Sequence, residues 1–131
     1  MKVTADTNVL LRTLVADDEA QTAKAVELLG SADMVAVSLQ TLCECVGVLR
    51  SRYGVKRADI AAAIRALLNT NNIVVNRPAA EAGLALLEAG GDFADGIIAF
   101  EGAWFGAEVF VSFDKQAVSL LTQQGQSARL L

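Results

Sequence analysis

The chain has 131 residues, a net charge of −4 and no histidine. This length gives one domain whose core needs no disulfide, and the acidic balance argues against a protein that coats nucleic acid through a bulk positive field, but not against an enzyme with a local basic rim. The lack of histidine excludes the serine and cysteine triads that depend on it and nearly every zinc site, so any chemistry must use carboxylates and hydroxyls.

Strands and helices alternate along the sequence. The predicted strands, read from short apolar and β-branched runs, cover residues 2–6, 34–39, 73–75, 108–113 and 128–131. The predicted helices cover residues 8–16, 41–53, 57–68, 79–89, 93–105 and 115–124, and a further helix begins at a capping box of Asp18 and Gln21 and ends at Gly30. This alternation indicates an α/β fold in which a mostly parallel sheet is covered by helices on both sides. Residues 1–131 are expected to form a single domain.

Four acidic residues stand alone in stretches that are otherwise apolar or uncharged: Asp6, Glu44, Asp95 and Asp114. A carboxylate in such a segment costs several kcal/mol unless it is paired, hydrogen-bonded or bound to a metal. No run of cations is placed to pair these four. In parallel α/β sheets the ligand crevice lies outside the carboxyl ends of the strands. Asp6 and Asp114 follow two predicted strands, and Glu44 and Asp95 lie in early turns of helices, so all four are expected to converge on that crevice.

The chemistry expected of such a cluster is that of a magnesium or manganese site. These ions prefer oxygen ligands, and two or three carboxylates suffice for each ion. They neutralise a phosphodiester and orient a water for in-line attack, which needs no histidine. We therefore expect Asp6, Asp95 and Asp114 to hold the ion and Glu44 to bind metal or to position the attacking water.

Each acid also has a purely structural interpretation. Asp6 and Asp114 precede predicted helices and are possible caps, although Thr7 or Asn8 is expected to cap the first helix better than Asp6. Glu44 is compatible with a half-exposed helix position. Asp92, a possible fifth acid, is expected to be a helix cap rather than a ligand.

Polar and basic neighbours extend the candidate site. Thr7 and Asn8 are expected to orient a metal-bound water or a phosphate oxygen, and Ser112 to hydrogen-bond either a carboxylate or its own backbone. Four cations without an intervening acid follow Glu44. They are either a solvated helix end or contacts to RNA phosphates, and they are Arg50, Arg52, Lys56 and Arg57.

Four short segments, in this order, resemble PIN-domain proteins, and within that family the ribonuclease toxins of VapBC toxin–antitoxin pairs. The segments are Ala5-Asp6-Thr7-Asn8-Val9-Leu10-Leu11, Glu44 followed by Val48-Leu49, Asp92-Phe93-Ala94-Asp95, and Ser112-Phe113-Asp114-Lys115. The resemblance covers essentially the whole chain. Two positions depart from the usual pattern: Gly96 stands where alanine is more common, and Ser112 where threonine is more common.

The resemblance implies an α/β/α sandwich that binds magnesium or manganese through an acidic cluster and cleaves RNA endonucleolytically. It implies that Asp6, Glu44 and Asp95 are the principal acids, that Asp114 completes the cluster, and that Thr7, Asn8 and Ser112 support it. It also implies a homodimer and an antitoxin whose C-terminal segment covers the active site.

Other functions and the cellular location are expectations of the same kind. A receiver-like phospho-signalling module also carries carboxylates at the carboxyl edge of a parallel sheet, but it would need adjacent acids near the first strand. An inactive PIN-like module that only binds a partner is a further alternative. No stretch reaches the about 20 apolar residues of a membrane span, and the N-terminus lacks the pattern of a signal peptide. A cytoplasmic protein without membrane contact is therefore expected.

Overall fold

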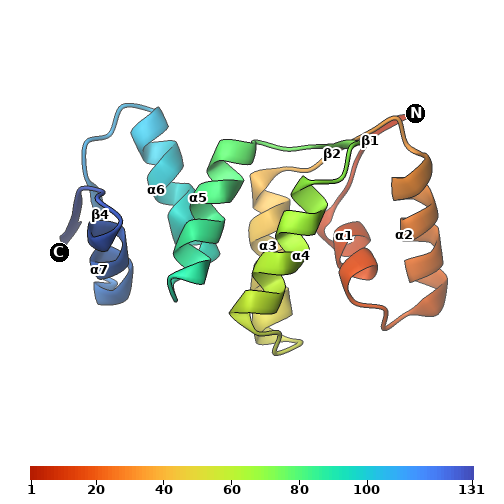
Figure 1. Cartoon of the computed structure of the whole chain (residues 1–131), viewed down its shortest axis with the longest axis horizontal. Helices are drawn as coiled ribbons and strands as arrows, with labels where there is room; N and C mark the ends of the chain where they lie inside the picture. The colour runs from red at the N-terminus through yellow and green to blue at the C-terminus, as the bar shows by residue number, and fades with distance from the viewer. The chain divides into compact units, whose positions relative to one another are not determined.

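The computed structural model describes all residues from 1 to 131 and consists of two compact units, Met1–Asn76 and Arg77–Leu131, which we call unit 1 and unit 2. Figure 1 shows the helices and strands of both units, coloured from red at the N-terminus to blue at the C-terminus. Each unit has its own sheet, and every strand pairing is parallel.

Unit 1 is built on a three-stranded parallel sheet in the order β1-β2-β3. Its elements are β1 (Lys2–Thr4), α1 (Thr7–Leu14), α2 (Glu19–Ser31), β2 (Met34–Ala36), α3 (Leu39–Ser51), α4 (Arg57–Leu68) and β3 (Ile73–Val74). The central strand pairs Val35 with Val3 on one side and with Ile73 on the other, and Val35 is fully buried. Helix α1 lies beside α2, and α3 lies beside α4 (Figure 1).

Three of the four helices of unit 1, α1, α2 and α3, begin where a side chain caps their first turn, whereas α4 begins after Lys56 without such a cap. The carboxylate of Asp18 accepts a hydrogen bond from the backbone N–H of Gln21 at 3.1 Å, which confirms the predicted start of α2. The hydroxyl of Ser38 accepts from the N–H of Thr41 at 3.1 Å, so α3 begins at Leu39, two residues before the predicted start. This cap also ends the preceding strand at Ala36 rather than at Leu39.

Unit 2 contains three helices and a short two-stranded sheet. Its elements are α5 (Arg77–Glu88), α6 (Phe93–Trp104), β4 (Phe110–Ser112), α7 (Lys115–Gln123) and β5 (Ala128–Leu130). Strands β4 and β5 pair in parallel, with Val111 opposite Arg129. Leu86, Ala99 and Leu121 form a buried cluster that joins α5, α6 and α7, and Phe110 of β4 packs against it.

The contact between α5 and α6 is unusually close because two glycines face it. A Cβ atom built on Gly96 of α6 would lie 2.5 Å from the carbonyl oxygen of Ala82 and 2.9 Å from the Cα of Gly83, both on α5. A Cβ atom on Gly83 would lie 2.9 Å from the ring of Phe93. The backbone of the first turns of α6 is therefore seated directly on α5, and this seat positions Asp95, the residue before Gly96.

The α/β class and the parallel pairing that the sequence predicts are confirmed, and the order of elements agrees with the prediction throughout. The strand predicted over residues 108–113 is shorter, and it is less buried than its apolar composition suggests, since Val111 is 48% exposed. No helix has the length and apolar character needed to cross a membrane.

Candidate acidic site

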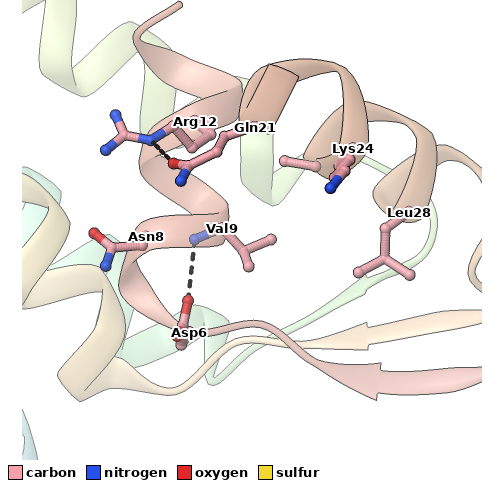
Figure 2. A pocket seen from close by; sticks show the side chains of 8 residues that line it. Asp6, Asn8, Val9, Arg12, Gln21, Lys24 and Leu28 are labelled. Carbon is pink, nitrogen blue, oxygen red and sulfur yellow. Dashed lines mark hydrogen bonds between the residues drawn. The ribbon is translucent and has the colours of Figure 1, made fainter. Parts of the chain in front are cut away.

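Asp6 marks the end of β1 and the start of α1. Its Oδ1 accepts a hydrogen bond from the backbone N–H of Val9 at 3.0 Å, as Figure 2 shows. Asp6 is therefore the cap of α1, and the expectation that Thr7 or Asn8 caps this helix better is wrong. The reason is the extended backbone of Asp6, which ends the strand and lets Thr7 begin the helix. The cap uses Oδ1 and leaves Oδ2, on this exposed side chain, for another partner.

Glu44 on α3 is linked to the start of α1. The hydroxyl of Thr7 donates to Oε2 of Glu44 at 2.7 Å, and Nε2 of Gln40, one turn earlier on α3, lies 3.4 Å from Oε1. Thr7 therefore hydrogen-bonds an acid, Glu44, whereas its expected role of orienting a metal-bound water or a phosphate oxygen stays a prediction. The Glu44 side chain is exposed, so its apolar neighbours in the sequence do not bury it.

The two acids of unit 1 act on the same buried thiol. Burial, together with the smaller effect of the negative charges of Glu44 and Asp6, raises the pKa of Cys45 to about 12. The Cys45 Sγ lies 3.6 Å from the carbonyl oxygen of Thr7. Asp6 and Glu44 therefore lie on the same side of unit 1, close enough to share an electrostatic environment.

A hollow between α1 and α2 opens beside Asp6 (Figure 2). Its lining residues are Asp6, Asn8, Val9, Arg12, Gln21, Lys24, Ala25 and Leu28. On its wall, the Nε of Arg12 donates to Oε1 of Gln21 at 2.8 Å. Asn8 lines this hollow and also a second groove between α1 and α3. Helix α1 therefore presents polar groups to both sides, beginning at its capped end.

A hydrogen-bonded network next to this hollow was not foreseen. Arg12 forms an ion pair with Asp17, and the hydroxyl of Tyr53 donates to the other oxygen of Asp17 at 2.6 Å. The hydrogen bond from Tyr53, followed by the charge of Arg12, lowers the pKa of Asp17. The network ties the loop after α1 to the end of α3. The only sequence signal for it is the adjacent pair Asp17 and Asp18, of which one caps α2 and the other is left for Arg12.

Three acids of unit 2 lie near one another at the starts of α6 and α7. Asp92 caps α6 by accepting from the N–H of Ala94 at 3.2 Å, which confirms its predicted role as a cap. Asp114 caps α7 by accepting from the N–H groups of Gln116 at 2.9 Å and Ala117 at 3.2 Å. Asp95 is half-buried in the first turn of α6. Burial raises the pKa of Asp95, and the charges of Asp92 and Asp114 raise it further.

Two side chains hold this group of acids in place. The hydroxyl of Ser112 accepts from the backbone N–H of Asp114 at 2.9 Å, so of its two predicted roles Ser112 takes the backbone one. The Nε2 of Gln116 donates to the carbonyl oxygen of Gly90 at 3.1 Å, which ties the start of α7 to the loop before α6. The role of Gln116 was not predicted, because nothing in the sequence marks Gly90 as its partner.

The four cations after Glu44 lie at the junction of α3 and α4. Arg50 is on the last turn of α3, Arg52 follows the helix, and Lys56 and Arg57 begin α4. Of these four, Arg52 is the one that lines the groove containing Thr7 and Glu44. Arg52 therefore shares a groove with Glu44, and contacts of the four cations to RNA stay a prediction.

The donor set suits a hard divalent cation, because the available ligands are carboxylate and hydroxyl oxygens. Asp95 is half-buried, has a raised pKa and has two acids as its electrostatic neighbours, so a cation there would relieve repulsion. Neither unit brings three or more acid or thiol side chains into an arrangement that holds a metal ion. The structure thus shows interacting acids within unit 2, two acids near one thiol within unit 1, and no complete metal centre.

Comparison with known proteins supports one family. The model of the PIN domain matches residues 3–120, which include all four candidate acids and parts of both units. No curated protein matches the chain. PIN domains are generally nucleases, and many use divalent metals. Because the match covers most of the sequence and agrees with the α/β structure, the chain belongs to the PIN domain family.

Proposed function

We propose that this protein is a metal-dependent endoribonuclease and the toxin of a VapBC-type pair. The family supports a nuclease, and the resemblance of the segments around Asp6, Glu44, Asp95 and Asp114 to those of VapBC toxins supports the toxin subfamily. The observation that carries the proposal is Asp95, a half-buried carboxylate whose neighbouring charges are also negative. Such a residue is unfavourable in a purely structural role, because burial and like charge both oppose its ionised form.

In this proposal each unit contributes two of the principal acids. Asp6 and Glu44 come from unit 1, and Asp95 and Asp114 come from unit 2. A bound Mg²⁺ or Mn²⁺ would supply charge neutralisation at the phosphodiester and a more acidic water. Glu44, oriented by Thr7 and Gln40, is placed to accept a proton from the attacking water.

The capping roles of Asp6 and Asp114 are compatible with this function. Each cap engages Oδ1, so the second carboxylate oxygen remains available to a cation. The cap also fixes the rotamer of the side chain, which reduces the entropy lost on binding a ligand. Ser112 adds to this by holding the backbone of Asp114.

The proposal includes the partners of such toxins. We propose a cognate antitoxin whose C-terminal segment covers the acids, a homodimer of this chain, and a location in the cytoplasm. Expression together with a small protein encoded by the neighbouring reading frame, followed by size-exclusion chromatography with light scattering, tests these points directly. A monomer that neither binds nor is inhibited by that protein would contradict the toxin–antitoxin assignment.

Cleavage of a structured RNA is the direct test of the activity. Wild-type protein with Mg²⁺ or Mn²⁺ is expected to cut the RNA, and chelation with EDTA is expected to stop cleavage. Asp6→Asn and Asp95→Asn are expected to reduce the rate by at least about 100-fold, the scale of losing a preorganised electrostatic contact. Cleavage that survives both substitutions would overturn the proposed mechanism.

The chain offers a matched control for Asp6→Asn. Asp18 caps α2 as Asp6 caps α1, with Oδ1 accepting from a backbone N–H three residues later. Asparagine caps nearly as well as aspartate, so Asp18→Asn makes the same chemical change outside the acidic site and is expected to leave cleavage intact.

The receiver-like alternative has its own test. Phosphorylation of the protein by a small phosphodonor, together with a lack of nuclease activity, would favour that alternative.

A further inference from the structure

A groove of about 490 Å³ runs between α1 and α3 within unit 1. Its residues on α3 are spaced three or four apart and so share one face of that helix. The groove is lined by Thr7, Asn8 and Leu11 of α1 and by Glu44, Gly47, Val48, Ser51 and Arg52 on α3 and at its C-terminal cap. Glu44 stands at one end and Arg52 at the other, with small side chains between them. Five of the eight lining residues carry polar side chains that could hydrogen-bond a ligand: Thr7, Asn8, Glu44, Ser51 and Arg52.

Arg52 is exposed and takes part in none of the ion pairs of the chain, whereas Arg12 is paired with Asp17. An exposed guanidinium without a carboxylate partner presents its donors to a ligand, and phosphate matches their geometry. The eight residue steps from Glu44 to Arg52 correspond to about 12 Å along a helix axis. That distance exceeds the roughly 3.4 Å rise per nucleotide of a stacked strand, so one strand would place different phosphates at the two residues.

Gly47 forms the middle of the groove floor. A Cβ atom added to Gly47 would meet no atom within 4 Å, so no close packing requires glycine there. Glycine inside a helix is less favourable than alanine, because its backbone loses more freedom on folding. The local effect of Gly47 is thus to leave space next to Glu44, where any other residue would project into the groove.

We propose that the α1–α3 groove binds the single-stranded segment of RNA next to the cleaved bond, with Arg52 on a backbone phosphate and Gly47 giving the strand access to Glu44. This proposal rests on the proposed ribonuclease function and adds to it the path of the substrate. It also separates Arg52 from the other three cations, none of which lines this groove.

The first test measures binding without cleavage. A fluorescent single-stranded RNA is titrated with the full chain at several salt concentrations in the presence of EDTA, which withholds the metal ion that the proposed cleavage requires. Arg52→Gln is expected to weaken binding about tenfold, the scale of a hydrogen bond to a charged group. The slope of log K against the logarithm of the salt concentration should become shallower by about 0.7, the contribution of one phosphate of a single strand.

The comparison variant is Arg50→Gln, which removes the same charge from the same helix outside the groove. It is expected to weaken binding by no more than about twofold, since an exposed charge acts only weakly through the solvent. Equal effects of Arg50→Gln and Arg52→Gln would overturn the proposal, because they would show that only the general positive field matters.

The second test fills the groove. Gly47→Gln adds a long, uncharged side chain that favours helix, so the melting temperature should not fall. The KM for RNA should rise by about tenfold or more, while kcat changes less, because substrate access is lost and the acids are untouched. Gly30→Gln is the matched control: Gly30 is also an exposed helical glycine with no atom within 4 Å of an added Cβ, but it lies on α2.

The two proposals fail in distinguishable ways. Absence of cleavage by the wild type would contradict the proposed function, whereas the binding measurement would still decide the groove. A folded Gly47→Gln variant with unchanged KM and unchanged affinity for RNA would overturn the groove proposal. A Gly47→Gln variant that no longer binds the proposed antitoxin but keeps its affinity for RNA would also overturn the groove proposal, because the groove would then bind protein rather than RNA.

Discussion

Replacing Gly96 with alanine is expected to destabilise unit 2, although alanine is the better helix former. The added Cβ would lie 2.5 Å from the carbonyl oxygen of Ala82 and 2.9 Å from the Cα of Gly83. An ordinary contact between a carbon and a carbonyl oxygen is about 3.3 Å or more. Helix α6 must therefore move away from α5 by about 0.8 Å at this point, because both contacts are to backbone and neither can rotate aside.

The expected magnitude follows from two opposing terms. Overpacking of a well-packed interface costs about 1–3 kcal/mol, and a clash with backbone belongs at the upper end of that range. The change from glycine to alanine in a helix returns about 1 kcal/mol. The net loss is then about 1–2 kcal/mol. The displacement also moves Asp95, which precedes Gly96, so RNA cleavage is expected to fall together with stability.

Urea denaturation followed by circular dichroism measures this loss. The midpoint of Gly96→Ala is expected to fall by about 0.5–1 M at an unchanged m-value. Gly102→Ala, on the same helix, is the control, because its added Cβ has Ala107 Cβ at 3.9 Å as its nearest neighbour. That variant should gain stability. A Gly96→Ala protein as stable as the wild type would refute the argument that glycine is required for the contact of α6 with α5.

Three further predictions concern the acids. Asp95→Asn should stabilise the metal-free protein at pH 7. The pKa of Asp95 is raised in the folded state, so the folded wild type loses stability as the pH rises from 3.8 through that raised pKa. Thermal melting followed against pH should therefore show that the gain in the variant vanishes in acid. Tyr53→Phe should lower the melting temperature at neutral pH and have a smaller effect in acid. The hydrogen bond from Tyr53 lowers the pKa of Asp17 in the folded state, and this contributes stability above pH 3.8 that disappears as the pH falls through the folded pKa. Asp114→Ala should cost about 1 kcal/mol in urea denaturation through loss of the α7 cap, whereas Asp114→Asn should keep the cap and still abolish cleavage. A destabilised Asp95→Asn protein, a pH-independent effect of Tyr53→Phe, or full activity of Asp114→Asn would contradict the respective argument.

The elements were predictable because their signals are local. The apolar period of residues 57–68 and the cap at Asp18 agree with α4 and with the start of α2. The predicted helix boundaries were wrong where two neighbouring residues could each cap the start of the helix. Ser38 caps α3, although Thr41 marked its predicted start, and Asp6 caps α1, although its own neighbours are also good caps. The local sequence contains both possible capping residues, and the position at which the preceding strand ends determines which of them caps the helix.

The candidate site was predictable in composition but not in its contacts. The isolation of Asp95 and Asp114 in apolar runs marked them as unusual, and their charges do interact. The partner of Glu44, by contrast, depends on which face of α3 meets α1, and the hydrogen bond from Thr7 follows from that packing. Gly96 shows the same limit. The sequence indicated only that alanine is more common at this position, whereas in the structure Gly96 lies against the backbone of Ala82 and Gly83 on α5, 14 and 13 residues away in sequence.

Capping and catalysis use the same aspartates, and this sets how their roles can be separated. At Asp6 and Asp114 one carboxylate oxygen holds backbone N–H groups, which fixes both the helix and the side chain. Alanine removes both contributions, so a loss of activity in that variant is ambiguous. Asparagine keeps an oxygen for the cap and removes the charge. A nuclease site needs the charge, whereas a purely structural cap does not. The asparagine variants therefore distinguish a PIN nuclease from an inactive PIN-like module, because only in the nuclease does the function disappear while the fold remains.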